Sequence, residues 1–144
     1  MASGGTSEGS VLQSSLIMGG IDDGVTRYSG QQQGYENTSG VKRLVGLSGA
    51  GHLAFSDLCL LGRENGGLVE IAQNAGVSGA AFASFLWDGC DEGQLAAEIS
   101  IEIVKDISTL ILEEVLQCRG SNAAEIAQLG SRYPDVGEYL ESLE

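Results

Sequence analysis

The chain has few basic residues, no long apolar run and almost no proline, and these shortages exclude several classes of function. Its 144 residues include 7 lysines and arginines against 20 aspartates and glutamates, a formal net charge of −13. Such a surface repels phosphate groups, so neither a nucleic acid nor a membrane is expected as a partner. No apolar run approaches the roughly 18 residues of a membrane helix. The start lacks the basic and apolar regions of a signal peptide. We therefore expect a soluble protein, cytoplasmic as given.

Histidine and cysteine are also scarce. The single histidine, His52, is too few for a usual zinc site, and no two cysteines have metal-type spacing. Three cysteines do not make a disulfide scaffold. Cys59 and Cys90 both lie beside predicted loops and could pair, but buried free thiols are the favoured interpretation.

Glycine, by contrast, is abundant, with 22 residues in 144. Glycine permits tight turns and close backbone approaches, which loops at active sites often use. The apolar content of 42% and charged content of 19% are those of a folded protein, and the length suits one domain. Residues 1–13 are polar and glycine-rich and are predicted to be a flexible tail, which leaves 14–144 as the domain.

The short apolar run at residues 16–18 predicts a buried parallel strand, and the segment 41–47, which contains Leu44-Val45-Gly46-Leu47, is a second strand candidate. Gln31, Gln32 and Gln33 favour a short helix between them. From residue 54 onward the pattern is helical. It predicts short helices near residues 58–61, 68–75 and 80–86, a loop at 87–93, a long helix at about 94–118, and short helical ends at 122–130 and 135–143.

The long predicted helix carries an apolar stripe at helical spacing. Its members are Ile99, Ile103, Ile107, Leu110 and Ile111, widened by Val104, Leu112 and Val115. Two strands alone make an inadequate sheet, and a parallel pair needs neighbours and helices on both faces. The sequence therefore predicts an α/β fold that is the C-terminal portion of a larger sheet.

Candidate catalytic groups follow each predicted strand. Asp22 and Asp23 come after the first strand, and His52 follows the second on the loop of residues 48–51. An Asp pair can equally form a turn or cap a helix, and His52 could be a solvated loop residue. However, the acid precedes the histidine, as in the Ser, Asp, His chain order of α/β-hydrolases. The acid there fixes the histidine tautomer while the imidazole takes the serine proton.

Longer segments strengthen this comparison. Residues 16–26, Leu-Ile-Met-Gly-Gly-Ile-Asp-Asp-Gly-Val-Thr, resemble the strand and acid loop of α/β-hydrolases. Residues 42–59, Lys-Arg-Leu-Val-Gly-Leu-Ser-Gly-Ala-Gly-His-Leu-Ala-Phe-Ser-Asp-Leu-Cys, resemble their last strand and histidine loop. Together with Asp-Gly-Cys at 88–90, the chain over about 11–144 is similar to bacterial dienelactone hydrolases and platelet-activating-factor acetylhydrolases.

The resemblance implies that Asp23 and His52 are catalytic and that no metal or organic cofactor is needed. Asp23 fits the family pattern Asp-x-Val/Ile-Ala/Thr better than Asp22, although Arg27 stands where the family often has proline. The main departure is the nucleophile. Ser7, within Gly-Thr-Ser-Glu-Gly at residues 5–9, fits the letters of the serine elbow without the strand before it or the helix behind it. A packed helix cysteine is the preferred interpretation of Cys59 over a substitute nucleophile.

Two functions follow. In the first, the chain is the acid- and histidine-bearing segment of a serine hydrolase that cleaves carboxylic esters or related acyl bonds. Its parent would bind a small-molecule ester, and the nucleophile and oxyanion hole would belong to a missing N-terminal half. In the second, the chain is a non-catalytic binding or assembly module derived from such a fold, and a homodimer would cover its apolar faces.

Overall fold

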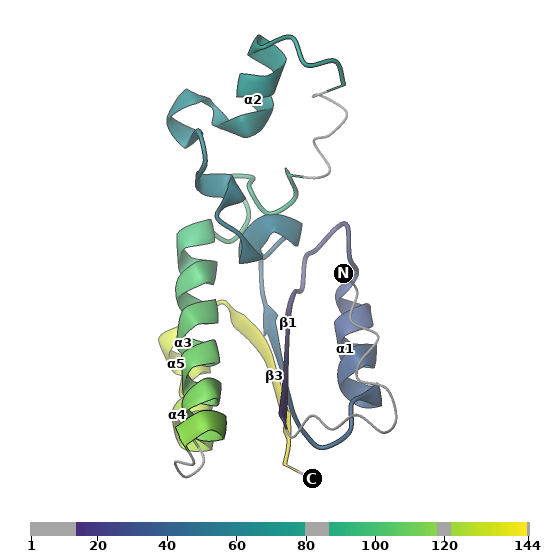
Figure 1. Ribbon diagram of the computed structural model, residues 1–144, viewed down its shortest axis with the longest axis vertical. Helices are drawn as coiled ribbons and strands as arrows, with labels where there is room; N and C mark the ends of the chain where they lie inside the picture. The colour runs from purple at the N-terminus through teal and green to yellow at the C-terminus, as the bar shows by residue number, and fades with distance from the viewer. Residues whose placement is uncertain (1–13, 80–86, 118–121, 144) are drawn as a thin grey trace.

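The computed structural model describes residues 14–79, 87–117 and 122–143, and these form a three-stranded sheet with helices on both faces (Figure 1). Strand β1 (Ser14–Gly20) pairs in parallel with β2 (Val41–Leu47), which occupies the centre. Strand β3 (Val136–Ser142) lies antiparallel on the other side of β2. The predicted α/β class and the predicted parallel pair are confirmed.

Strand β3 corrects the sequence prediction, which placed a helical end at residues 135–143. Partners distant in sequence hold this segment in the sheet. The Tyr28 hydroxyl donates to Glu138 Oε2 at 2.7 Å, and Arg43 Nε donates to Glu141 Oε1 at 2.7 Å. The spacing of three between Glu138 and Glu141 also suits a helix, so tertiary pairing decided the outcome.

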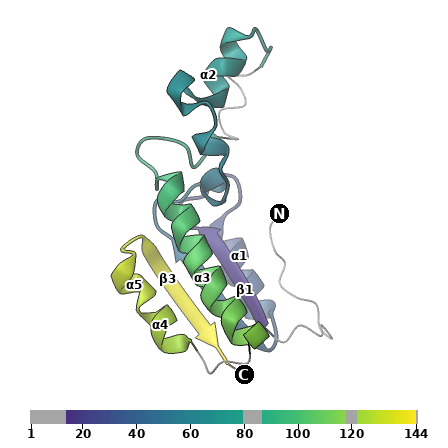
Figure 2. The ribbon, with the colours of Figure 1, turned by 60° about the vertical axis from the view of Figure 1, so that its left-hand side comes forward.

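Helices cover the two faces unequally (Figures 1 and 2). Helix α1 (Tyr28–Asn37), which contains the predicted Gln31 to Gln33 segment, covers one face. The other face is covered by α3 (Ala97–Gln117), α4 (Ala123–Ala127) and α5 (Leu129–Arg132). The long predicted helix and the helical segment after residue 122 are confirmed. None of the described helices is both long and apolar enough to cross a membrane.

Between β2 and α3 the chain makes an excursion away from the sheet (Figure 2). It contains three short 3-10 turns, His52–Phe55, Leu58–Leu60 and Arg63–Asn65, followed by α2 (Gly67–Asn74). Helix α2 confirms the helix predicted near 68–75. The helix predicted near 58–61 is instead a 3-10 turn, and the one predicted at 80–86 lies outside the described residues.

The core lies between the sheet and α3. Val45 and Leu47 of β2 and Ile103 and Ile107 of α3 are each 0% exposed. The predicted stripe on α3 is only partly buried, because Ile99, Leu112 and Val115 are 39%, 54% and 42% exposed. The buried part of the stripe is therefore narrower and shorter than the sequence pattern predicted, and it centres on Ile103 and Ile107.

A buried cation joins β2 to two neighbouring elements. The side chain of Arg43 is 0% exposed, and its Nη2 lies 2.8 Å from Glu114 Oε1 on α3. Its Nε lies 2.7 Å from Glu141 Oε1 on β3. Burial lowers the pKa of Arg43, but the hydrogen bonds and charges of the two glutamates outweigh burial and raise it. The guanidinium therefore stays charged and ties the long helix to β2 and β3.

A disulfide joins Cys59 to Cys90. The favoured prediction of buried free thiols was therefore wrong for this pair, and the pairing that the sequence left open is the one adopted. The bond fastens the start of the excursion to the loop that returns from it. Cys118 and the serine Ser7 lie outside the described residues, as does the tail predicted at 1–13.

Candidate functional site

The candidate site lies where β1 and β2 end. Parallel strands place their carboxyl ends at one edge of a sheet, so the loops that follow them are neighbours. The register pairs Gly20 with Leu47, and Ile21 N donates to Leu47 O at 2.9 Å. Asp23 lies on the loop after β1, and His52 begins the 3-10 turn after β2. The fold thus brings together the two side chains that the sequence singled out.

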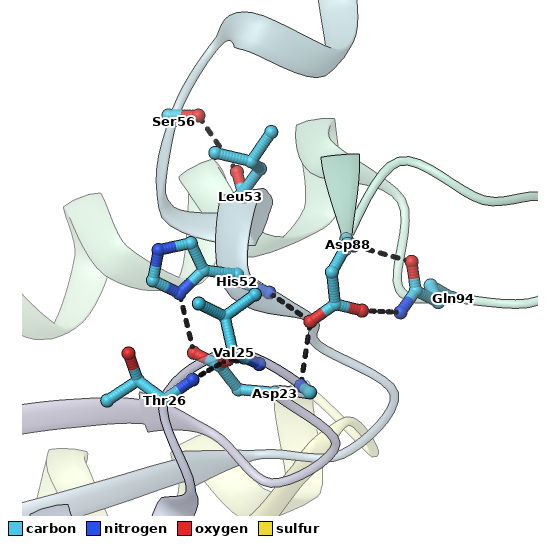
Figure 3. Close-up of polar contacts among 10 residues, drawn as sticks. Asp23, Val25, Thr26, His52, Leu53, Ser56, Asp88 and Gln94 are labelled. Atoms are coloured by element: carbon cyan, nitrogen blue, oxygen red, sulfur yellow. Dashed lines mark hydrogen bonds and ion pairs between the residues drawn. The ribbon is translucent and has the colours of Figure 1, made fainter. Parts of the chain in front are cut away.

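The acid and the histidine are in direct contact (Figure 3). His52 Nδ1 lies 3.0 Å from Asp23 Oδ2, which is within hydrogen-bonding distance. The other carboxylate oxygen of Asp23 accepts the backbone N–H groups of Val25 at 2.8 Å and Thr26 at 2.6 Å. The Asp23 side chain is 7% exposed and that of His52 is 32% exposed. The carboxylate is therefore fixed, while the ring keeps one side open.

This contact defines the tautomer that the site favours. An ionised carboxylate only accepts hydrogen bonds, so Nδ1 must carry the proton that it donates to Asp23. The lone pair of the neutral ring is then on Nε2. Figure 3 shows this second nitrogen pointing away from Asp23, and within the described residues it has no hydrogen-bond partner. Such a nitrogen is available to take a proton from another group.

The neighbouring aspartates Asp22 and Asp23 make different contacts. Asp22 Oδ2 accepts the backbone N–H of Gly49 at 2.7 Å, which ties the acid loop to the turn after β2. Asp23 forms a local turn through one oxygen and faces His52 through the other. The structure therefore confirms a turn at this pair, and of the two aspartates it is Asp23 that contacts His52. Its role as a catalytic acid stays a prediction.

A third carboxylate, Asp88, was not predicted as part of the site. Its Oδ2 accepts the backbone N–H of Gly24 at 2.8 Å and that of His52 at 2.9 Å. Its Oδ1 accepts Gln94 Nε2 at 2.7 Å. Burial raises the pKa of Asp88, but the hydrogen bonds from Gln94, Gly24 and His52, with the charge of His52, together lower it. The sequence marked Asp88 only within a loop, because nothing local reveals where its carboxylate points.

Glycine allows the histidine loop and the Asp88 loop to approach this closely. A Cβ on Gly51 would overlap the backbone nitrogen of Gly89. A Cβ on Gly89, whose φ is +107°, would lie 2.8 Å from the backbone nitrogens of Leu53 and Ala54. Across this contact Leu53 N donates to Asp88 O at 2.6 Å. The small residues before His52 therefore serve backbone packing, as the sequence suggested.

The remaining chemistry candidates lie elsewhere. The Cys59 thiol is consumed by the disulfide, so this residue cannot be a nucleophile while the bond is intact. A cavity of about 670 Å³ beside the disulfide and the start of α3 is lined by neither Asp23 nor His52. Within the described ranges no group of three or more metal-ligating side chains could hold a metal ion. The site is thus an acid–histidine pair with a supporting carboxylate.

Comparison of the chain with protein-family models, curated proteins and solved structures found no match.

Proposed function

We propose that this chain is the acid- and histidine-bearing segment of a serine hydrolase that acts on carboxylic esters or related acyl bonds. The observation that carries the proposal is the 3.0 Å contact between His52 Nδ1 and Asp23 Oδ2, with Nε2 left open. Asp23 would orient the imidazole and stabilise its protonated form. His52 would take the proton of a serine outside this chain and then return it to the leaving group.

The open edge of β1 supports a sheet that continues beyond this chain. Among the described residues β1 pairs only with β2, and the strand contains the apolar run Leu16, Ile17 and Met18. An apolar strand with unpaired N–H and C=O groups is a template for another strand. A parallel strand added at this edge would end beside Asp23, where a serine elbow would meet the imidazole. We propose that the missing N-terminal half supplies it.

The substrate would be a small-molecule ester bound mainly by that missing half. Nothing in the proposed chemistry requires a cofactor, because the acyl-enzyme route uses a hydroxyl, a base and an oxyanion hole. The isolated chain should therefore show negligible turnover of an activated acetate ester and no labelling by a fluorophosphonate probe. The natural gene product, including any upstream open reading frame, should show both.

His52→Ala and Asp23→Ala in the complete product should abolish or strongly reduce turnover and labelling. Asp57→Ala is the matched control, because Asp57 is an exposed aspartate in the loop that follows His52. A natural product that carries no serine elbow and stays unlabelled would contradict the proposal. So would labelling of the complete product that is unchanged in His52→Ala.

A further inference from the structure

Asp88 connects the two loops that carry the acid and the histidine. Its Oδ2 accepts the N–H of Gly24, the residue after Asp23, and the N–H of His52 itself. A single carboxylate oxygen therefore bridges the two loops that must meet for the Asp23–His52 contact to form. Figure 3 shows Asp88 beside the pair, with the imidazole on the far side of the His52 backbone.

Several other contacts hold Asp88 in this position. Gln94 Nε2 donates to Asp88 Oδ1 at 2.7 Å, while Gln94 Oε1 accepts Gly89 N at 2.6 Å and Asp91 N at 3.2 Å. The disulfide anchors Cys90, two residues further along the chain, to Cys59. The histidine turn is fixed separately, because the Ser100 hydroxyl on α3 donates to Ala54 O. The loop that carries the Asp88 carboxylate is therefore held in place by the Gln94 hydrogen bonds and by the disulfide.

We propose that Asp88 is a positioning residue that sets the orientation of His52 relative to Asp23. This inference rests on the function proposed above, since positioning matters only if the pair performs chemistry. Asp88 does not touch the imidazole nitrogens in the hydrogen-bond pattern and acts through the backbone of His52 and Gly24. Hydrogen bonds to a charged acceptor are stronger than neutral ones, so the carboxylate is better suited to this bridge than an amide.

The substitution Asp88→Asn shows why the carboxylate is required. With its oxygen facing Gly24 and His52, the asparagine would turn its NH2 group toward the NH2 group of Gln94. If Gln94 then rotated its amide, its oxygen would leave the N–H groups of Gly89 and Asp91. If the asparagine turned the other way, its NH2 group would face two backbone donors. Each arrangement leaves donors opposed, so Asp88→Asn should loosen the bridge while preserving side-chain volume.

The test uses NMR of the single histidine in ¹⁵N-labelled protein. In the wild-type chain we expect the proton on Nδ1 and slow exchange of the Gly24 and His52 amides. In Asp88→Asn we expect the Nδ1–H signal to broaden or shift as the ring loses its fixed contact with Asp23. Exchange of the two amides should quicken by roughly 10- to 100-fold, the effect of losing a charged hydrogen-bond acceptor. Asp91→Asn is the matched control, with the same charge change at an exposed position in the same loop.

A second variant keeps the test decisive. If Asp88→Asn does not fold, Gln94→Ala leaves the carboxylate in place but removes its support, and a smaller change of the same kind is expected. Wild-type-like ring and amide signals in folded Asp88→Asn, or in Gln94→Ala where only that variant folds, would overturn the positioning role. A wild-type ring without the proton on Nδ1 would instead overturn the proposed function, so the two failures are distinguishable.

Discussion

The disulfide between Cys59 and Cys90 gives a stability prediction whose size follows from the chain itself. The bond closes a loop with a sequence separation of 31 residues. In the chain-entropy model, a loop of this length removes enough freedom from the unfolded state to stabilise the fold by about 3.7 kcal/mol at room temperature. Packing among the described residues of the loop would do little to replace the disulfide, because Leu61, Ile71 and Val77 are 48%, 38% and 56% exposed.

The assay is urea unfolding of the wild-type chain and of the double variant Cys59→Ser with Cys90→Ser, each with and without reductant. The double variant should unfold at a midpoint lower by roughly 1–4 M urea, given the usual dependence of stability on urea for small proteins. Reductant should shift the wild-type midpoint toward that of the variant and leave the variant unchanged. Cys118→Ser, which removes the third cysteine, is the matched control and should retain the effect of reductant.

Two results would contradict the predicted stabilisation by the disulfide. Titration of thiols in the denatured, unreduced wild-type chain could find all three cysteines of the sequence free, so that no bond forms. Alternatively, the bond could be present while the wild type and the double variant unfold at the same urea concentration. A stable bond would also favour an oxidising compartment, because disulfides persist mainly there.

Three further predictions concern stability and assembly. Arg43→Ala leaves Glu114 and Glu141 without their buried partner and should lower the free energy of unfolding by about 3–5 kcal/mol. Arg132→Ala should lower it by less than about 1 kcal/mol, because the side chains of Arg132 and its partner Asp106 are 65% and 36% exposed. Equal losses for the two variants in urea unfolding would contradict this prediction. Because the pKa of Asp88 is lower when folded, its carboxylate stabilises the fold above the unfolded pKa of 3.8 and this stabilisation disappears as pH falls through the lower folded pKa. The difference in melting between wild type and Asp88→Asn should thus be full at neutral pH and shrink in acid, and a constant difference would contradict it. Sedimentation at micromolar concentration should find self-association of the isolated chain through its open β1 edge and exposed apolar residues, whereas a cooperatively melting monomer would show that the core is sufficient.

For some elements, the pattern of residues within the segment was enough to predict the structure that it forms. The apolar residues within the segment 41–47 predicted β2, and the periodic residues of α3 predicted a long helix. The Asp23–His52 contact was also predictable, because strand ends of a parallel pair meet at one edge. For β2 and α3, the residues near in sequence already contain the controlling signal.

Elements that depend on distant partners could not be predicted in this way. Strand β3 is held by Tyr28 and Arg43, which lie far earlier in the chain than Glu138 and Glu141. Asp88 is a loop aspartate in the sequence, and its role appears only when the excursion returns beside His52. The same return brings Cys90 to Cys59. These features depend on packing between residues far apart in the sequence, and no short motif predicts them.

The most direct test of the central claim is the protonation pattern of the His52 ring, which a single histidine makes unambiguous in ¹⁵N NMR. We expect the proton on Nδ1 and the lone pair on Nε2 in the neutral wild-type ring, because Asp23 accepts from Nδ1. Asp23→Asn should move the proton toward Nε2, since the asparagine amide can donate to Nδ1. Asp57→Asn is the matched control and should leave the ring unchanged, because Asp57 is exposed in the loop that follows His52. A wild-type ring protonated on Nε2, or one that is unaffected by Asp23→Asn, would show that Asp23 does not orient His52.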